Sequence, residues 1–383
     1  MTLPIYLDFN ATTPVATEVA NAIEPYLREH FGNPSSNHLF GQRAHDAVER
    51  ARAQVATLIG AKPEEIVFTG CATEANNLAI LGVARAMKGR GRHLITSAVE
   101  HPAVSAPMTH LREEGWEVRV LPVDATGRVV PADLVSALRA DTVLVSVMHA
   151  NNEVGTLQPI AELAALAKRH GALFHTDAAQ SVGKVPVDVD ALGVDLLILA
   201  GHKFYAPKGI GALYVREGTP IEPILFGAGH EHGLRPGTEN LPHIVGLGMA
   251  AEMAQRKLPE VTERLHKQRD ALHQRLAAVI PGLILNGHPE QRLPNTLNLS
   301  FPGVSGRALL DRTPSVAASV GSACHEEVDA VSGVLGAMGV ETDRAGGAVR
   351  LSIGEPTTDD EIRLAADALI GTWRSLSSHS NQL

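Results

Sequence analysis

The sequence predicts an α/β fold in which helices cover a mostly parallel sheet of seven strands. In the first two thirds of the chain, short runs of β-branched and apolar residues alternate with segments of helical periodicity. The runs are continuously apolar, as is typical of strands that are buried on both faces of a parallel sheet. The predicted strands are Glu65–Thr69, His93–Ser97, Val118–Leu121, Thr142–Val147, Leu173–Thr176, Leu196–Ala200 and Gly211–Val215.

Helical periodicity identifies two of the connecting segments. The first helix has charged residues on one face and apolar residues at helical spacing on the other, namely Ala44, Val48, Ala51, Val55 and Leu58. The second predicted helix, Ile160–His170, is followed by Gly171, at the position where glycine commonly ends a helix.

The pattern changes near Lys257–Pro259. A long charged amphipathic helix is predicted from Glu260 to about Ile280, and a final helix from Thr358 to about Trp373. Two further runs, Thr296–Ser300 and Ala348–Ile353, predict strands between these helices. The change indicates a smaller α+β domain. The polar tail from Ser375 is expected to be mobile.

Composition restricts the class of protein. With 383 residues, 44% of them hydrophobic and 20% charged, the chain is expected to be globular and soluble. Its net charge of −9 and its lack of lysine- or arginine-rich runs argue against nucleic acid and membranes as partners. We find no signal-peptide pattern and no apolar stretch of about 18 residues. The chain has two cysteines, Cys71 and Cys324, which favours a reducing compartment and a cytoplasmic location.

Polar residues follow several of the predicted strands at their carboxyl ends, where open α/β sheets bind their ligands. These residues are Thr69–Thr73, Glu100–His101, His149–Asn152, Asp177 and Lys203. Their convergence on one sheet edge is stronger evidence for a site than any one segment alone.

Lys203 and Asp177 indicate what chemistry that site performs. A lysine amine at the end of a buried strand can form a Schiff base with pyridoxal phosphate (PLP), and an aspartate can keep the pyridinium nitrogen protonated. The alternatives are a surface lysine and an aspartate that caps a helix or forms an ion pair. Burial of a lysine costs stability and shifts its pKa, which favours the cofactor.

Neighbouring residues fit the same cofactor. Gln180 is placed to contact its phenolic oxygen, and the flat ring of His101 could stack on the pyridine. Gly70–Glu74 opens a helix after a strand, so that backbone N–H groups and the Thr73 hydroxyl could bind phosphate. An ordinary helix N-cap would have the same pattern.

The cysteines and one histidine pair allow further interpretations. Cys324 follows the small residues Gly321–Ala323, which suggests a loop whose thiol can move rather than a buried small hydrophobe. Cys71 is expected to be structural. His230 and His232 lack a third ligand at suitable spacing, and on an extended chain they would point in opposite directions, so no metal site is expected.

Separated motifs along nearly the whole chain resemble the class V aminotransferase family, specifically the NifS-like cysteine desulfurases. The resemblance implies a fold-type I PLP-dependent transferase with a large cofactor-binding domain, residues 14–257. It also implies a small domain, residues 1–13 plus 258–383, that carries the loop of the catalytic cysteine. The motifs are Tyr6–Thr13, Phe31–Ser36, Glu100–Ala103, Ala150–Gly155, His175–Lys184, Gly201–Gly211 and Arg235–Thr238.

The resemblance also implies roles for single residues around the cofactor. Lys203 is similar to the Schiff-base lysine, Asp177 to the pyridinium partner and His101 to the stacking ring. Two groups of residues are implied at the cofactor's oxygens: Asn152 and Gln180 at the phenolic oxygen, and Ala72, Thr73 and His202 at the phosphate.

Three more residues acquire roles toward substrate and partner. Arg350 resembles the clamp on the substrate carboxylate, a bidentate task suited to a guanidinium, and Asn152 would also face the substrate. Thr238 resembles a threonine that reaches the phosphate of the other subunit, which implies a homodimer. Cys324 resembles the nucleophilic cysteine, which reacts as its thiolate.

The implied activity is conversion of L-cysteine to L-alanine. The sulfur would be carried as a persulfide on Cys324 to an acceptor such as an iron–sulfur scaffold protein. A selenocysteine lyase acting on L-selenocysteine is the alternative, because His325–Asp329 replaces the usual hydroxyl-rich run. A plain transaminase and a scaffold protein without PLP are further alternatives. Ala200 replaces the usual serine, so one hydrogen bond to the phosphate is expected to be missing.

Overall fold

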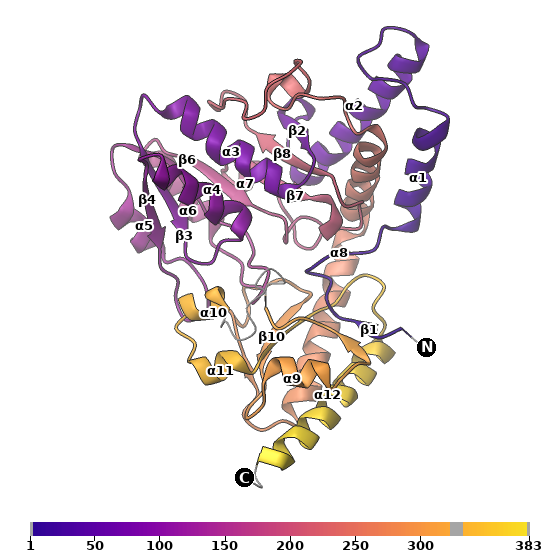
Figure 1. The fold of residues 1–383 in the computed structure, drawn as a ribbon, viewed down its shortest axis with the longest axis vertical. Helices are drawn as coiled ribbons and strands as arrows, with labels where there is room; N and C mark the ends of the chain where they lie inside the picture. Colours follow the sequence, from indigo (N-terminus) through magenta and orange to yellow (C-terminus); the bar gives the residue numbers. More distant parts are fainter. Residues whose placement is uncertain (1–2, 322–331, 381–383) are drawn as a thin grey trace.

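The computed structural model describes residues 3–321 and 332–380, and its centre is a seven-stranded sheet (Figure 1). Strand β8 runs antiparallel to both of its neighbours, and the other pairs are parallel. The predicted α/β class is therefore confirmed. In sheet order the strands are β2 (Ile66–Thr69), β8 (Gly211–Val215), β7 (Leu196–Ala200), β6 (Leu173–Asp177), β5 (Thr142–Ser146), β3 (His93–Ser97) and β4 (Glu117–Leu121).

Helices cover both faces of this sheet. Successive residues of a strand point to opposite faces, so each strand contributes side chains to two apolar cores. Phe68 and Val145 belong to an apolar core shared with α2 (Leu39–Ile59), α6 (Ile160–Arg169) and the start of α8. Their neighbours Val67 and Leu144 belong to a separate core shared with α3 (Ala72–Met87) and α4 (Pro102–Glu113). Both faces are buried, which explains the continuous apolar runs in the sequence.

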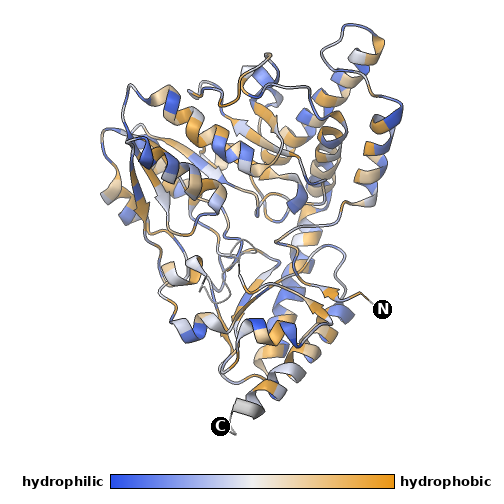
Figure 2. Cartoon of the chain, in the orientation of Figure 1, coloured by the Kyte–Doolittle hydropathy of each residue, from blue (hydrophilic) through white to orange (hydrophobic). Residues whose placement is uncertain are grey.

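A second sheet and its helices lie below the first in the view of Figure 1. It consists of β12 (Ala348–Ser352), β10 (Thr296–Ser300) and β9 (Ile284–Leu285), all antiparallel. Its apolar core includes Leu299 and Leu351, the C-terminal half of α8 (Leu241–Ala277) and α12 (Asp359–Ser380). Leu7 from the start of the chain is fully buried in this core. Figure 2 shows apolar residues concentrated on the inner faces of the helices.

The N-terminal segment joins this second part through strand pairing. Strand β1 (Ile5–Tyr6) runs parallel to β11 (Val316–Ala317), and Asp8 forms an isolated bridge with Ser352 of β12. The remaining helices are α1 (Thr17–Arg28), α5 (Pro131–Ala137), α7 (Val189–Leu192), α9 (Gly306–Asp311), α10 (Gly333–Ala337) and α11 (Thr342–Gly346), with short 3-10 turns at Pro63–Glu65, Gly201–Lys203 and Glu231–Gly233.

Two helix boundaries predicted from the sequence were wrong. Helix α8 begins at Leu241 rather than Glu260, and Pro259 lies inside it. Packing against α1 and α2 on one half and α12 on the other holds the helix across the proline that suggested a start. The last helix does not stop near Trp373 but continues to Ser380, because Trp373 and Leu376 pack on the second core. The boundary of the two domains near residue 257 stays a prediction.

No helix in the described part of the chain is long and apolar enough to cross a membrane.

Candidate active site

A cavity of about 240 Å³, here called the inner cavity, lies at the carboxyl ends of β6 and β7. It brings together most of the residues predicted from the sequence, from six separate stretches of the chain. The predicted residues that line it are Ala72, Thr73, His101, Asn152, Asp177, Gln180, His202, Lys203 and Arg350. Asn10, Ala11, Cys71, Ala103, Met148, Ala150, Ala179 and Ala200 complete the lining.

Lys203 enters the cavity from the 3-10 turn that follows β7. Its Nζ donates hydrogen bonds to the backbone oxygens of Asn10, at 2.7 Å, and Ala11, at 2.8 Å. Asn10 was not among the predicted site residues, although the motif Tyr6–Thr13 contains it. The N-terminal segment thus supplies acceptors that hold the amine of Lys203 at the cavity.

Asp177 is the last residue of β6 and only 6% of its surface is exposed. One carboxylate oxygen accepts from Asn76 Nδ2 at 2.9 Å, and the other accepts from the backbone N–H of Ala179 at 2.9 Å. These donors fix the orientation of the carboxylate. Asn76, in the first half of α3, is a further residue that sequence reasoning missed.

His101 caps the N-terminus of α4, and its Nδ1 accepts a hydrogen bond from the backbone N–H of Ala103 at 3.1 Å. Burial lowers the pKa of the imidazole, the nearby Asp177 opposes this shift, and Lys203 adds to it. The ring is therefore neutral at physiological pH, and its plane is fixed by the bond through Nδ1. A neutral flat ring suits stacking on an aromatic ligand better than an exposed cation does.

The N-terminus of α3 forms another wall of the cavity, at Ala72 and Thr73. The first N–H groups of a helix have no partner within the helix, and the helix dipole favours an anion there. Gly211 of β8 permits this position, since a Cβ on it would lie 2.9 Å from the backbone carbon of Cys71 and 3.0 Å from Ala72 N. Cys71 caps the helix, with its sulfur accepting from Glu74 N at 3.5 Å.

Gln180 is held by a buried network. Its Nε2 donates to the backbone oxygen of Asn10 at 3.0 Å, while its Oε1 accepts from Lys184 Nζ at 2.8 Å. Burial, with Lys203 and Arg350 nearby, lowers the pKa of Lys184 well below its ordinary value. The backbone oxygen of Asn10 can only accept, so it fixes Nε2 as the donating end of the Gln180 amide.

Arg350 lies in β12 and reaches the cavity from the second part of the molecule. The sequence alone left a surface ion pair as the simplest alternative for this residue, but Arg350 is only 2% exposed. Its guanidinium donates to Asp8 Oδ1 at 2.7 Å and to the backbone oxygen of Asn152 at 3.2 Å. Its Nε is buried and has no hydrogen-bond partner among the described residues.

Thr238 is exposed in the loop before α8 and does not line the inner cavity. Cys324 lies outside the described residues, as does the segment His325–Asp329.

His202 lines the cavity, and burial together with Lys203 lowers its pKa to about 4. Its Nδ1 is 3.2 Å from Thr12 Oγ1.

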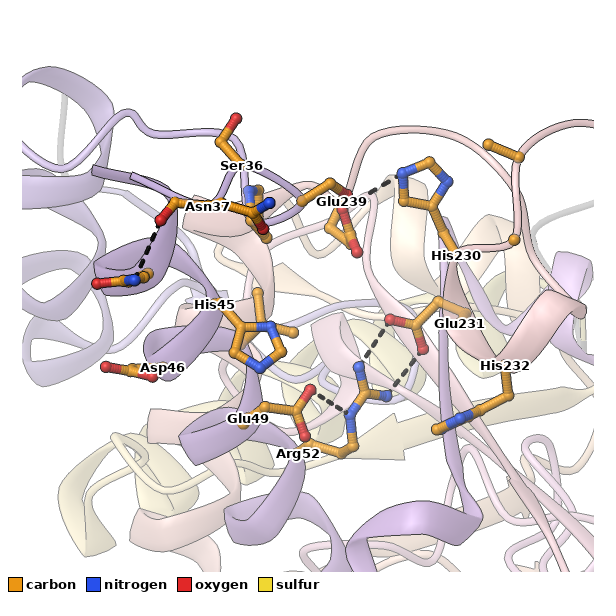
Figure 3. A pocket seen from close by; sticks show the side chains of 16 residues that line it. Ser36, Asn37, His45, Asp46, Glu49, Arg52, His230, Glu231, His232 and Glu239 are labelled. Carbon is orange, nitrogen blue, oxygen red and sulfur yellow. Dashed lines mark hydrogen bonds and ion pairs between the residues drawn. The ribbon is translucent and has the colours of Figure 1, made fainter. Parts of the chain in front are cut away.

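A second, larger pocket of about 850 Å³, here called the outer pocket, lies between α2 and the loop at residues 228–239 (Figure 3). Arg52 and Glu231 form a bidentate ion pair there, both bonds measuring 2.8 Å. Figure 3 shows His230 directed toward Glu239 instead of toward His232. In the part of the chain that the structure describes, no three His, Cys, Asp or Glu side chains are grouped as a metal site would require.

Comparison with known proteins extends these observations. Residues 5–364 match the family model described as aminotransferase class-V. A cysteine desulfurase IscS of Dictyoglomus turgidum is 47% identical over 383 residues, which is 99% of this chain and 97% of the relative.

Two solved structures are similar along most of their length. One, described as a NifS-like protein, superposes with a TM-score of 0.91 at 38% identity, covering 98% of this chain and 100% of its own. The other, SspA in complex with cysteine, has a TM-score of 0.81 at 37% identity and covers 91% of this chain and 98% of its own.

Proposed function

This chain belongs to the class V aminotransferase family and is an enzyme of the cysteine desulfurase type, and we propose that its inner cavity binds PLP and L-cysteine. The observation that carries the proposal is the convergence of Lys203, Asp177 and Arg350 on one small cavity. An amine, a buried carboxylate and a buried guanidinium match the aldehyde, the ring nitrogen and the substrate carboxylate respectively.

The donor set fits PLP at each of its polar groups. Asp177 would pair with the ring nitrogen, His101 would cover the ring face, and Gln180 Nε2 would reach the phenolic oxygen. The helix N-terminus at Ala72 and Thr73 and the imidazole of His202 would hold the phosphate. Asn152 would lie at the phenolic oxygen and the substrate. When bound, PLP supplies an aldehyde for the amine of L-cysteine and a ring that accepts electrons from its Cα.

The residues of the chain then perform the remaining tasks. Arg350 would bind the substrate carboxylate, so that Cα lies near Lys203. The amine of Lys203, held beside the backbone oxygens of Asn10 and Ala11, would move the proton at Cα. The neutral ring of His101 would exclude water from one side of the site.

Cys324 would receive the sulfur. Its thiolate attacks the sulfur of L-cysteine, the carbon–sulfur bond breaks, and Cβ takes up a proton. L-alanine leaves and a persulfide remains on Cys324, so one thiol and one cysteine yield one persulfide and one alanine. An acceptor such as an iron–sulfur scaffold protein would then take the sulfur. Thr238, exposed in a single chain, would reach the phosphate of the other subunit in a homodimer.

Alanine release tests this function directly. The PLP-loaded protein should release L-alanine from L-cysteine and acquire a persulfide, and Cys324→Ala should do neither while it retains the PLP absorption band. Cys71→Ser, a change at the other cysteine that keeps a side-chain acceptor for Glu74 N, should still acquire the persulfide. A Cys324→Ala protein that still forms alanine and sulfide at the normal rate would contradict the role of Cys324.

The same assay with L-selenocysteine tests the alternative function. The curated relatives are named cysteine desulfurases, which favours L-cysteine as the substrate. Turnover of L-selenocysteine with none of L-cysteine would overturn that assignment.

A further inference from the structure

The N-terminal segment places one carboxylate beside the arginine of the inner cavity. Asp8 Oδ1 accepts from Arg350 Nη2 at 2.7 Å, and their side chains are 18% and 3% exposed. The second oxygen, Oδ2, accepts from Ser319 Oγ at 3.0 Å. Both oxygens of the carboxylate are therefore occupied by protein donors, and its orientation is fixed.

The backbone on both sides of Asp8 is also fixed. Leu7 N donates to Ala317 O at 2.8 Å, and Phe9 N donates to Ser352 O at 3.2 Å. Asp8 thus lies between the stretch after β11 and strand β12, which carries Arg350. Arg350 and Ser319 are themselves joined by an isolated antiparallel bridge. A carboxylate held this firmly can hold the guanidinium in one position.

Arg350 needs such a partner because it is a cation at 2% exposure. A buried charge without compensation is costly, and a guanidinium that loses its partner would move toward solvent or toward another acceptor. The bond from Nη1 to the backbone oxygen of Asn152 supports one side of the group, and Asp8 supports the other. Nε is also buried, with no hydrogen-bond partner in the described part of the chain.

We propose that Asp8 is a positioning residue for substrate binding, which acts by holding Arg350 in the orientation that grips the substrate carboxylate. The proposal rests on the function proposed above, since it assigns the carboxylate of L-cysteine to Arg350. Asp8 is not among the residues that line the inner cavity, and we therefore assign it a positioning role that acts through Arg350. The proposal adds to the site one supporting residue, which lies more than 300 positions away from Arg350 in the sequence.

The positioning role predicts a change in KM without an equal change in kcat. In the PLP-loaded full-length protein, Asp8→Ala should raise KM for L-cysteine about tenfold, the scale expected for the loss of a charged hydrogen bond, with kcat changed less than about threefold. Asp8→Asn keeps an oxygen that can accept from Nη2 but loses the charge, so its KM should lie between those of the wild type and Asp8→Ala.

Equilibrium binding of L-alanine, measured calorimetrically on the same proteins, supplies a readout that does not depend on turnover. Its Kd should rise in parallel with KM, because the product carries the same carboxylate. Asp367→Ala is the matched control, since it removes an aspartate that pairs with Arg275 at 2.6 Å on the exposed surface. This control should leave KM, kcat and Kd unchanged.

A double-mutant cycle separates a positioning role from a general structural one. If Asp8 acts through Arg350, adding Asp8→Ala to Arg350→Ala should raise the Kd of L-alanine no further. A melting temperature that falls in Asp8→Ala while Kd and KM stay at wild-type values would overturn the proposal. So would an Asp8→Ala effect that persists in full on the Arg350→Ala background.

The two proposals fail in different ways. If the wild-type protein releases no alanine from L-cysteine, the proposed function is wrong. If it does release alanine but the Asp8 variants bind L-alanine as tightly as the wild type, only the role of Asp8 is wrong.

Discussion

The inner cavity and the outer pocket both hold charged side chains out of water, but they satisfy those charges in different ways. In the outer pocket, Arg52 and Glu231 bind each other. Arg52 also donates to Glu49 Oε1 and to the backbone oxygen of Ile66, and Glu231 accepts from the backbone N–H of Phe68. In the inner cavity, Lys203 contacts backbone oxygens and Asp177 contacts N–H donors.

This difference explains why the larger pocket is not the better candidate for catalysis. A bidentate ion pair satisfies both partners and stabilises the local fold, which leaves little for a ligand to gain. An amine and a carboxylate that are held by the protein frame beside an open volume can each act on a bound molecule. The volume of a pocket is therefore less informative than the way its charges are partnered.

The comparison predicts the largest effect for Lys203→Met. Turnover of L-cysteine should fall by about 10³-fold or more, because the proton at Cα would lose the group that moves it. The fold should be kept, since Asn10 O still accepts from Gln180 Nε2. Alanine release and thermal unfolding of the PLP-free protein check the two statements. Loss of folding in Lys203→Met would show that the amine is structural, like Arg52.

Arg52→Met should have the reverse outcome. It leaves Glu231 charged and buried without its partner, so the free energy of unfolding should fall by about 3–5 kcal/mol. Turnover per folded molecule should stay near the wild-type value. Urea unfolding followed by circular dichroism measures the loss, and Arg52→Met with Glu231→Gln should recover part of it. Unchanged stability in Arg52→Met would mean that the ion pair contributes nothing to the fold.

The smallest expected effect is on the pH dependence of the free energy of unfolding. It arises from His149 and His175, which are buried without a charged partner. Burial lowers the pKa of His149 to about 4 and that of His175 to about 3. Their unfolded pKa is about 6.5, so the unfolded chain binds protons first as the pH falls. The stability that they contribute is fully present above pH 6.5 and is lost below it, by at most about 1.4 kcal/mol per pH unit for each ring.

His175→Gln tests this sign. Its unfolding free energy should depend less steeply on pH between 6.5 and 5 than that of the wild type, and His232→Asn, at the outer pocket, is the control. Equal slopes in the wild type and His175→Gln would contradict the assignment of the buried neutral ring.

The residues that line the inner cavity illustrate how much of the candidate site could be predicted from the sequence. Lys203 and Asp177 could be predicted because each ends an apolar strand, and strand ends of a parallel sheet meet at one edge. The bounds of the seven strands of the main sheet agree with the predictions to within two residues. The start of α8 could not be predicted, because local sequence marks Pro259 as a helix start and only packing on α1, α2 and α12 overrules it.

The sequence by itself determined the alternation of strand and helix and the placement of Lys203 and Asp177 at the ends of neighbouring strands, where the inner cavity lies. Each of these follows from local patterns of apolar and polar residues. Only the tertiary structure decided that Asp8 and Asn10 support this site and that Arg52 and Glu231 form an ion pair. These contacts join residues far apart in the chain, and no local periodicity records which distant segments will pack together.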